Sequence, residues 1–203
     1  MKIMSKARFA LLVLPFLFFI SAGSSDRLNR ANAPFNWSLG LLHVQTGDML
    51  EFTAPVQSST GEKFRIVISP ETACFAYVFH ESLHEDGIDV IYAGPIKNDE
   101  TWYSSILTLI SPGGLESFYI VVSPEEQKTL AERINELVQD PEVAKNLAVK
   151  NEISRLQAEV SQVKEAPPKP ALMGGAARGT PGRNRGVEFS GLSTYVKTIS
   201  IIH

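Results

Sequence analysis

Runs of apolar residues alternate with turn-forming residues between about residue 39 and residue 122 of the chain. β-branched, aromatic and aliphatic residues fill runs of roughly four to eight positions, and Gly, Pro, Ser and Asp separate these runs. Short strands at a spacing of about ten residues predict a mainly antiparallel β sandwich or barrel-like domain. The expected strands cover residues 39–44, 49–53, 63–68, 73–79, 88–92, 103–110 and 117–122.

The alternation gives way to a helical period after Ser123. Ser123, Pro124 and Glu126 form the pattern of a capping box with proline at the first helical position, so a helix is expected to begin there. The β-rich domain, residues 24–139, is therefore predicted to end in a capped helix. The expected apolar face of this helix consists of Leu130, Ile134 and Leu137.

A second amphipathic helix is expected over residues 140–165. Its apolar residues follow alternating spacings of four and three, which is the pattern of a coiled-coil seam. The seam is shorter than the three or four heptads that indicate a coiled coil, so packing against the sheet or the preceding helix is the favoured interpretation. A homodimer through the seam is the alternative. The seam consists of Val149, Ile153, Leu156, Val160 and Val163.

The composition changes again over residues 166–193, where Pro, Gly and scattered Arg residues predict a flexible linker. Residues 194–203 are rich in β-branched side chains and predict a strand, because a disordered tail rarely has this composition. We expect the linker to return this C-terminal strand to the sheet. The predicted fold class is therefore α+β: an antiparallel β domain, followed by two helices and a returning C-terminal strand.

Residues 1–23 have the layout of a secretory signal peptide. Lys2, Lys6 and Arg8 precede the apolar run Phe9–Ile20, and small residues follow it. This run is shorter than the roughly 20 residues that span a bilayer, so membrane attachment is expected only if the signal stays uncleaved. The mature protein is predicted to be exported and to be periplasmic or extracellular.

Net charge and cysteine content narrow the possible partners and chemistry. The signal contains three of the 19 basic residues and none of the 22 acidic ones, so its removal leaves a net charge of about −6, which disfavours nucleic acid as a partner. Cys74 is the only cysteine of the sequence, which excludes an intramolecular disulfide. Its apolar and aromatic neighbours predict that Cys74 is buried and structural.

The string from His80 to His84 matches the zinc-protease pattern H-E-x-x-H. On a helix, residues four apart share one face about 6 Å apart, so His80 and His84 would bind zinc while Glu81 acts as the base. On a strand the same two histidines lie about 13 Å apart. The apolar run before His80 and the turn-forming Asp86 and Gly87 favour the strand. No metal site is therefore favoured, and polar residues at a hairpin end are the preferred interpretation.

Five strings occur in a familiar order: TGDMLEF at 46–52, CFAYVF at 74–79, VIYAGP at 90–95, PGGLESFYIVVS at 112–123 and FSGLSTYVKTI at 189–199. In spacing and hydrophobic type they resemble the bacterial domain-of-unknown-function family 4384, over about residues 40–139 and the final strand. The resemblance implies a small β-rich module that occurs alone on exported proteins or attached to kinases and caspase-like peptidases. It implies no catalytic residues.

The export signal, the β-rich core and the lack of an assembled catalytic set together favour one function. We expect an exported, non-catalytic binding or assembly module that contacts an envelope or extracellular protein through a sheet edge, a loop or the second helix. No cofactor and no catalytic residue is predicted. The alternatives are a zinc-dependent hydrolase that uses residues 80–84 and a structural dimer through the helix at 149–163.

Overall fold

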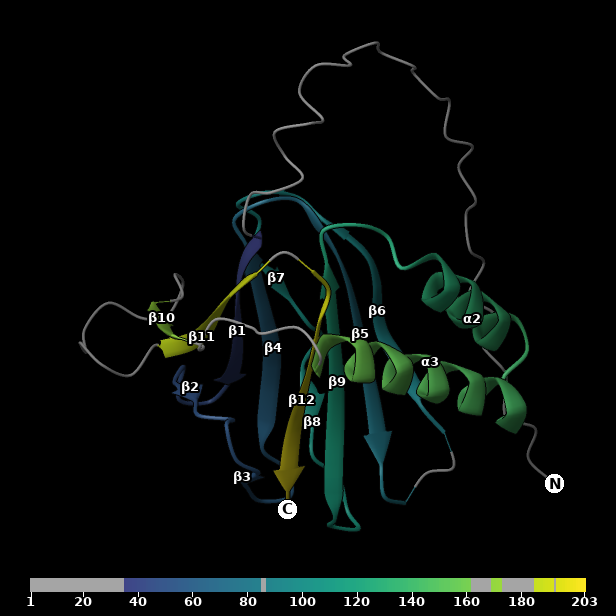
Figure 1. The fold of residues 1–203 in the computed structure, drawn as a ribbon. Helices are drawn as coiled ribbons and strands as arrows, with labels where there is room; N and C mark the ends of the chain where they lie inside the picture. The colour runs from purple at the N-terminus through teal and green to yellow at the C-terminus, as the bar shows by residue number, and fades with distance from the viewer. Residues whose placement is uncertain (1–34, 85–86, 162–168, 173–184, 192) are drawn as a thin grey trace, which may run out of the picture. The chain divides into compact units, whose positions relative to one another are not determined.

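The structure, a computed structural model, describes residues 35–84, 87–161, 169–172, 185–191 and 193–203. It is 46% strand and 21% helix, which confirms the predicted α+β class. The described strands form two open sheets, named sheet A and sheet B, and no closed barrel is found among them (Figure 1). The predicted signal peptide, residues 1–23, lies outside the described residues.

Sheet A has the strand order β10-β11-β1-β4-β7, with β2 beside β1 and β8 beside β4. Its neighbouring strands are antiparallel. On β1 the buried side chains of Trp37, Leu39 and Leu41 occupy alternate positions, so one face of the sheet is covered. The strands are β1 (Phe35–His43), β2 (Met49–Leu50), β4 (Lys63–Pro70), β7 (Trp102–Tyr103), β8 (Leu107–Thr108), β10 (Lys169–Leu172) and β11 (Arg185–Gly191).

Sheet B has the strand order β3-β12-β9-β5-β6. The C-terminal strand does return to the sheet, because β12 pairs antiparallel with β9 from Tyr195 opposite Val122 to Ile202 opposite Leu115. On its other side, β12 pairs parallel with β3. The strands are β3 (Val56–Gln57), β5 (Cys74–Ser82), β6 (Asp89–Ile96), β9 (Leu115–Ser123) and β12 (Tyr195–Ile202).

Because side chains alternate along β9, this strand contributes residues to a hydrophobic core on each face of sheet B. Phe118 and Ile120 join the inner core, which lies between sheet A and sheet B. Tyr119 and Val121 point the other way, into the outer core beneath the helices. Successive residues of a strand point to opposite faces, so β5, β6, β9 and β12 each contribute to both cores.

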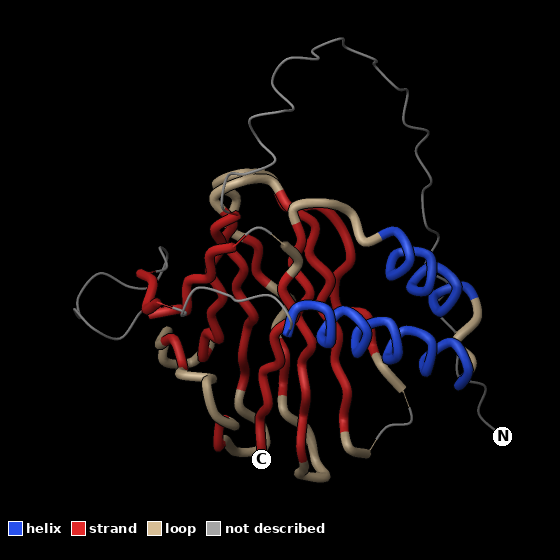
Figure 2. Tube along the Cα trace, viewed as in Figure 1, coloured by secondary structure: helices blue, strands red, loops and turns tan. Residues whose placement is uncertain are grey.

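Helices α2 (Lys128–Gln139) and α3 (Val143–Ser161) cover the outer face of sheet B (Figures 1 and 2). Among the described helices, none has the length and apolar composition that a membrane crossing requires. Val160 is half-buried, and Val163 lies outside the described residues. The helical side chains buried in the outer core are Leu130, Ile134 and Leu137 of α2 and Val149, Ile153 and Leu156 of α3.

The predicted cap at Ser123 is wrong, because α2 begins at Lys128 and the side chain of Gln127 makes no capping hydrogen bond. Ser123 is instead the last residue of β9, paired with Phe75 of β5. Its hydroxyl accepts hydrogen bonds from the Glu125 amide (3.3 Å) and the Gln127 side chain (2.9 Å). Pairing within the sheet therefore overrides the local helix signal.

The predicted flexible linker at 166–193 also needs correction, because β10 and β11 lie within it. β11 pairs with β1, and Phe189 is buried with its ring stacked on Trp37 at 4.7 Å. The Gly and Arg content of the segment hid the alternation of Val187 and Phe189, which is a strand pattern. Residues 162–168 and 173–184 of the predicted linker lie outside the described residues.

Candidate functional site

The structure does not bring the residues of the H-E-x-x-H string to one point. His80 and Glu81 are adjacent on β5 and face opposite sides of sheet B, where His80 stacks on Phe118 at 4.9 Å. His84 lies in the turn after β5 and donates from Nε2 to the Gly113 carbonyl at 3.0 Å. A zincin needs its histidines and its base around one metal. Within the described residues, no group of three or more His, Cys, Asp or Glu side chains could hold a metal ion.

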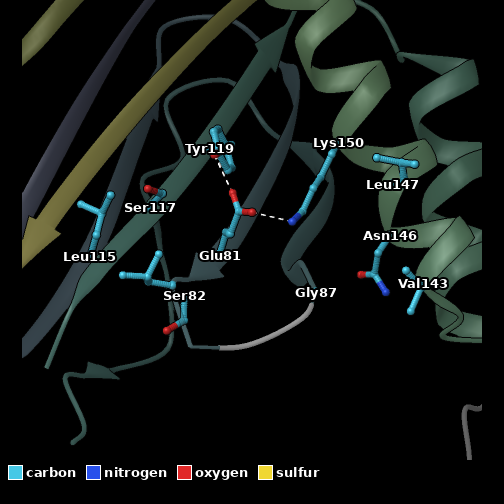
Figure 3. A pocket seen from close by; sticks show the side chains of 11 residues that line it. Glu81, Ser82, Gly87, Leu115, Ser117, Tyr119, Val143, Asn146, Leu147 and Lys150 are labelled. Atoms are coloured by element: carbon cyan, nitrogen blue, oxygen red, sulfur yellow. Dashed lines mark hydrogen bonds and ion pairs between the residues drawn. The ribbon is translucent and has the colours of Figure 1, made fainter. Parts of the chain in front are cut away.

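A groove of about 750 Å³ lies on the outer face of sheet B, beside α3. One wall comes from the C-terminal end of β5, the turn that follows it and the N-terminal half of β9. The other wall comes from the N-terminal half of α3 (Figure 3). Its strand side is lined by Glu81, Ser82, Leu83, Gly87, Leu115, Ser117 and Tyr119, and its helix side by Val143, Asn146, Leu147 and Lys150.

The base of the groove holds a polar triad of Glu81, Tyr119 and Lys150. The Glu81 carboxylate accepts hydrogen bonds from the Tyr119 hydroxyl at 2.7 Å and from the Lys150 ammonium at 2.5 Å (Figure 3). Burial alone would raise the pKa of Glu81, but the bonds from Lys150 and Tyr119 and nearby positive charge lower it overall. Burial, then the Glu81 hydrogen bond and charge, raise the pKa of Tyr119 to about 12. The triad therefore combines one carboxylate, one ammonium and a neutral phenol.

The rim of the groove is apolar and open to solvent. Its large apolar side chains are between 40% and 76% exposed. Exposed apolar side chains that gather around a hollow mark an interaction surface more often than isolated ones do. The rim consists of Leu83 and Leu115 on the strand side and Val143 and Leu147 on α3.

Asn146 fixes the wall of the groove to the rest of the domain. Its side-chain oxygen accepts a hydrogen bond from the Ile88 amide at 2.9 Å, and its side-chain nitrogen donates to the Glu142 carbonyl at 3.1 Å. The first bond ties the start of β6 to α3 across 58 residues of sequence. The geometry of the groove is therefore set by side-chain bonding as well as by apolar packing.

On the opposite face of the same strands, Glu116 forms a second polar cluster. It accepts hydrogen bonds from His80 at 2.6 Å, from Ser82 at 3.2 Å and from His203 at 3.3 Å. Sequence reasoning missed this cluster because the partners of Glu116 lie 34 to 87 residues away from it. One signal was available: Glu116 is in phase with the inward-facing Phe118 of an apolar strand.

Cys74 is buried in the inner core, as predicted. Burial raises the pKa of its thiol to about 12. A thiol of this kind is protonated at neutral pH and is a poor nucleophile. Cys74 therefore acts as a small apolar side chain of the core.

Comparison with protein-family models, curated proteins and solved structures found no match to this chain. The resemblance to family 4384 therefore stays a prediction.

Proposed function

We propose that this protein is an exported, non-catalytic module that binds an apolar segment of an envelope or extracellular partner protein in the groove beside α3. One observation carries the proposal: exposed apolar side chains surround a base whose carboxylate and ammonium neutralise each other. A groove of this kind suits a neutral, apolar segment better than an ion or a nucleic acid. Export rests on the predicted signal at residues 1–23.

The sheet edges are a weaker candidate for binding than the groove. In the described part of the chain, the outer strands β3 and β7 span two residues each and β10 spans four. The longer edge strand β6 has a bulge at Ile91, and Pro95 lacks a backbone N–H. The Pro95 carbonyl also accepts a hydrogen bond from the Tyr92 hydroxyl at 2.7 Å. Short strands, bulges and prolines are the devices that prevent an edge from adding a foreign strand.

A polypeptide segment fits the groove better than a small molecule does. The volume of about 750 Å³ falls within the range of small-molecule pockets, which is roughly 300–1,000 Å³, but the rim side chains are too exposed to enclose a small ligand. A row of apolar side chains from a helix or strand would cover them. An ammonium carries three N–H donors, so Lys150 can bond Glu81 and a backbone carbonyl of the partner together.

The two alternatives have less support than the groove. A zinc hydrolase needs His80 and Glu81 at one metal, whereas they face opposite sides of sheet B. A dimer through the predicted seam needs Val149, Ile153 and Leu156 at a surface, whereas the outer core of the same chain buries them. Each alternative would require local unfolding before its site could form.

Selection of short peptides from a displayed library against the full chain tests the proposal. We expect the selected peptides to share apolar residues at helix or strand spacing. We also expect Leu147→Asp to weaken their binding about tenfold or more, because it places a charge in the apolar rim. Ile110→Asp is the matched control, since Ile110 is an exposed apolar residue outside the groove.

The proposal fails if the selected peptides bind Leu147→Asp as tightly as they bind the wild type. It also fails if Ile110→Asp weakens binding as much as Leu147→Asp does. The Val143→Asp variant repeats the test on the same wall of the groove, so a local folding defect in one variant would be recognised.

A further inference from the structure

The Glu116 carboxylate joins segments that are distant in sequence. Glu116 lies on β9, while His80 and Ser82 lie on β5 and His203 follows β12. Each of these side chains donates a hydrogen bond to the carboxylate, at 2.6, 3.2 and 3.3 Å respectively. The carboxylate, near the start of β9, therefore connects the C-terminal ends of β5 and β12 on the inner face of sheet B.

The cluster is enclosed, which strengthens its interactions. Glu116 is 7% exposed, and the side chain of His203 is 0% exposed. His203 also contacts the Thr60 hydroxyl through Nδ1 at 3.2 Å, and its backbone amide donates to the Gly114 carbonyl at 3.1 Å. Hydrogen bonds to an ionised group in such a setting are about twice as strong as neutral ones. The end of β12 is thus tied to the turn before β9 and to the loop that contains Thr60.

We propose that Glu116 holds the end of β12 to sheet B through a hydrogen-bond cluster that opens in acid. This cluster, named the clasp, consists of Glu116, His80, Ser82 and His203. The ionised carboxylate accepts from His80, Ser82 and His203 together. A protonated carboxyl is itself a donor and has less acceptor capacity, so it cannot keep all of these bonds. Protonation would leave the enclosed His203 and the half-buried His80 and Ser82 to compete for fewer acceptor positions, which favours local opening over a closed clasp.

The charged groups around the cluster set the direction of the pH effect. The nearby charged or titratable groups are Asp89 of β6, whose Oδ2 lies 3.6 Å from Nδ1 of His80, and Glu81, which follows His80 on β5. His84 also lies nearby, where it bonds the carbonyl of Gly113. Burial would raise the pKa of Glu116, but the bonds from His80 and His203, the His80 charge and Ser82 lower it overall.

A lowered pKa in the folded state stabilises the fold above the unfolded pKa of about 4.3. This contribution is lost as the pH falls through the folded pKa. The clasp therefore holds at neutral pH and releases in acid, below about pH 4.3.

Opening of the clasp would also affect one wall of the groove. Ile202 pairs with Leu115, and Leu115 lines the groove on the other face of β9. Opening the end of β12 therefore removes a backbone neighbour from one groove wall. The clasp itself does not depend on the proposed binding function.

Amide hydrogen exchange of the full chain tests the clasp, with protection corrected for the intrinsic exchange rate at each pH. For the wild type, we expect protection in β12 to fall about tenfold or more relative to β4 between pH 7 and pH 3. Glu116→Gln, which cannot ionise, should show low β12 protection at both pH values. Glu152→Gln is the matched control, because Glu152 is buried on α3 and bonds Arg155 instead of β12.

The His203 variants give a second, independent readout. His203→Gln retains a donor that can reach Glu116, whereas His203→Leu does not, so we expect the glutamine variant to be better protected at pH 7. The His203→Leu variant also replaces Glu116→Gln if the latter does not fold. The clasp is rejected if β12 and β4 of the wild type lose protection together, or if Glu116→Gln keeps the pH profile of the wild type.

Discussion

The two faces of sheet B differ in chemistry at the same end of β5 and β9. On the inner face, Glu116 and its partners form a closed cluster in which polar groups are bonded to each other. On the outer face, the groove exposes apolar side chains around the bonded pair of Glu81 and Lys150. The polar groups of the inner face therefore bond the strands to one another, while the outer face keeps apolar side chains exposed to solvent.

This difference is produced by the alternation of residues along a strand. His80 and the Ser82 hydroxyl bond Glu116 on the inner face, and Glu81 and Leu115 face the groove on the outer face. A shift of one residue in the strand register would exchange the two sets of side chains. Correct register between β5 and β9 is therefore required for both the clasp and the groove.

The largest expected effect comes from adjacent isoleucines on β12 that face opposite sides. Ile201 is 0% exposed in the inner core, whereas Ile202 is 39% exposed. Ile201→Ala should lower the free energy of unfolding by about 2–5 kcal/mol, because it leaves a cavity in a packed core. Ile202→Ala should cost clearly less, about 1 kcal/mol, since its side chain is already partly exposed to solvent. Urea unfolding of each variant at neutral pH measures the difference, and equal costs would contradict the assignment of faces.

Hydrophobic pattern alone located the strands of sheet B well. The expected strands at 73–79 and 117–122 correspond to β5 and β9, and the expected strand at 194–203 corresponds to β12. These segments were readable because each combines β-branched residues with flanking turn formers. The apolar faces of both helices were also readable from their spacing.

The candidate site was not readable to the same degree. Glu81 belongs to the H-E-x-x-H string, yet its partners Tyr119 and Lys150 lie 38 and 69 residues away in the sequence. Such pairings depend on which strands are neighbours and on where α3 packs. Local sequence does not contain that information, because a residue's partners across a sheet are set by tertiary contacts. The helix start after Ser123 was misplaced for the same reason.

An intermediate effect is expected at the turn before β9, where the inner cluster meets the chain after β12. A Cβ atom on Gly113 would lie 2.4 Å from the backbone oxygen of His203, so the backbone would have to move. Gly113→Ala should therefore lower the free energy of unfolding by about 1–3 kcal/mol. Gly94→Ala is the control, because its Cβ would meet the Tyr92 hydroxyl at 3.4 Å, which a small side-chain shift can accommodate. If thermal unfolding shows Gly113→Ala to be as stable as the wild type, the close packing at this turn is not as described.

The smallest effect is expected at the groove, from the ion pair of Glu81 and Lys150. These side chains are part-exposed, and ion pairs in such positions contribute about 0–1 kcal/mol, so Glu81→Gln should cost no more than that at pH 7. Because its surroundings lower the pKa of Glu81, the contribution exists above the unfolded pKa of about 4.3 and is lost as the pH falls through the folded pKa. The cost of Glu81→Gln should therefore be smaller at pH 3 than at pH 7. Urea unfolding at pH 7 and pH 3 measures it.

Glu116→Gln, measured in the same way, completes the comparison. Its cost at pH 7 should exceed that of Glu81→Gln, because it leaves the enclosed donor of His203 and the half-buried donor of His80 without a full acceptor. Lys150→Met should match Glu81→Gln, since each variant removes the same pair. If Glu81→Gln proves as costly as Glu116→Gln, the groove has a structural role as large as that of the clasp. The distinction between a holding face and a binding face would then be lost.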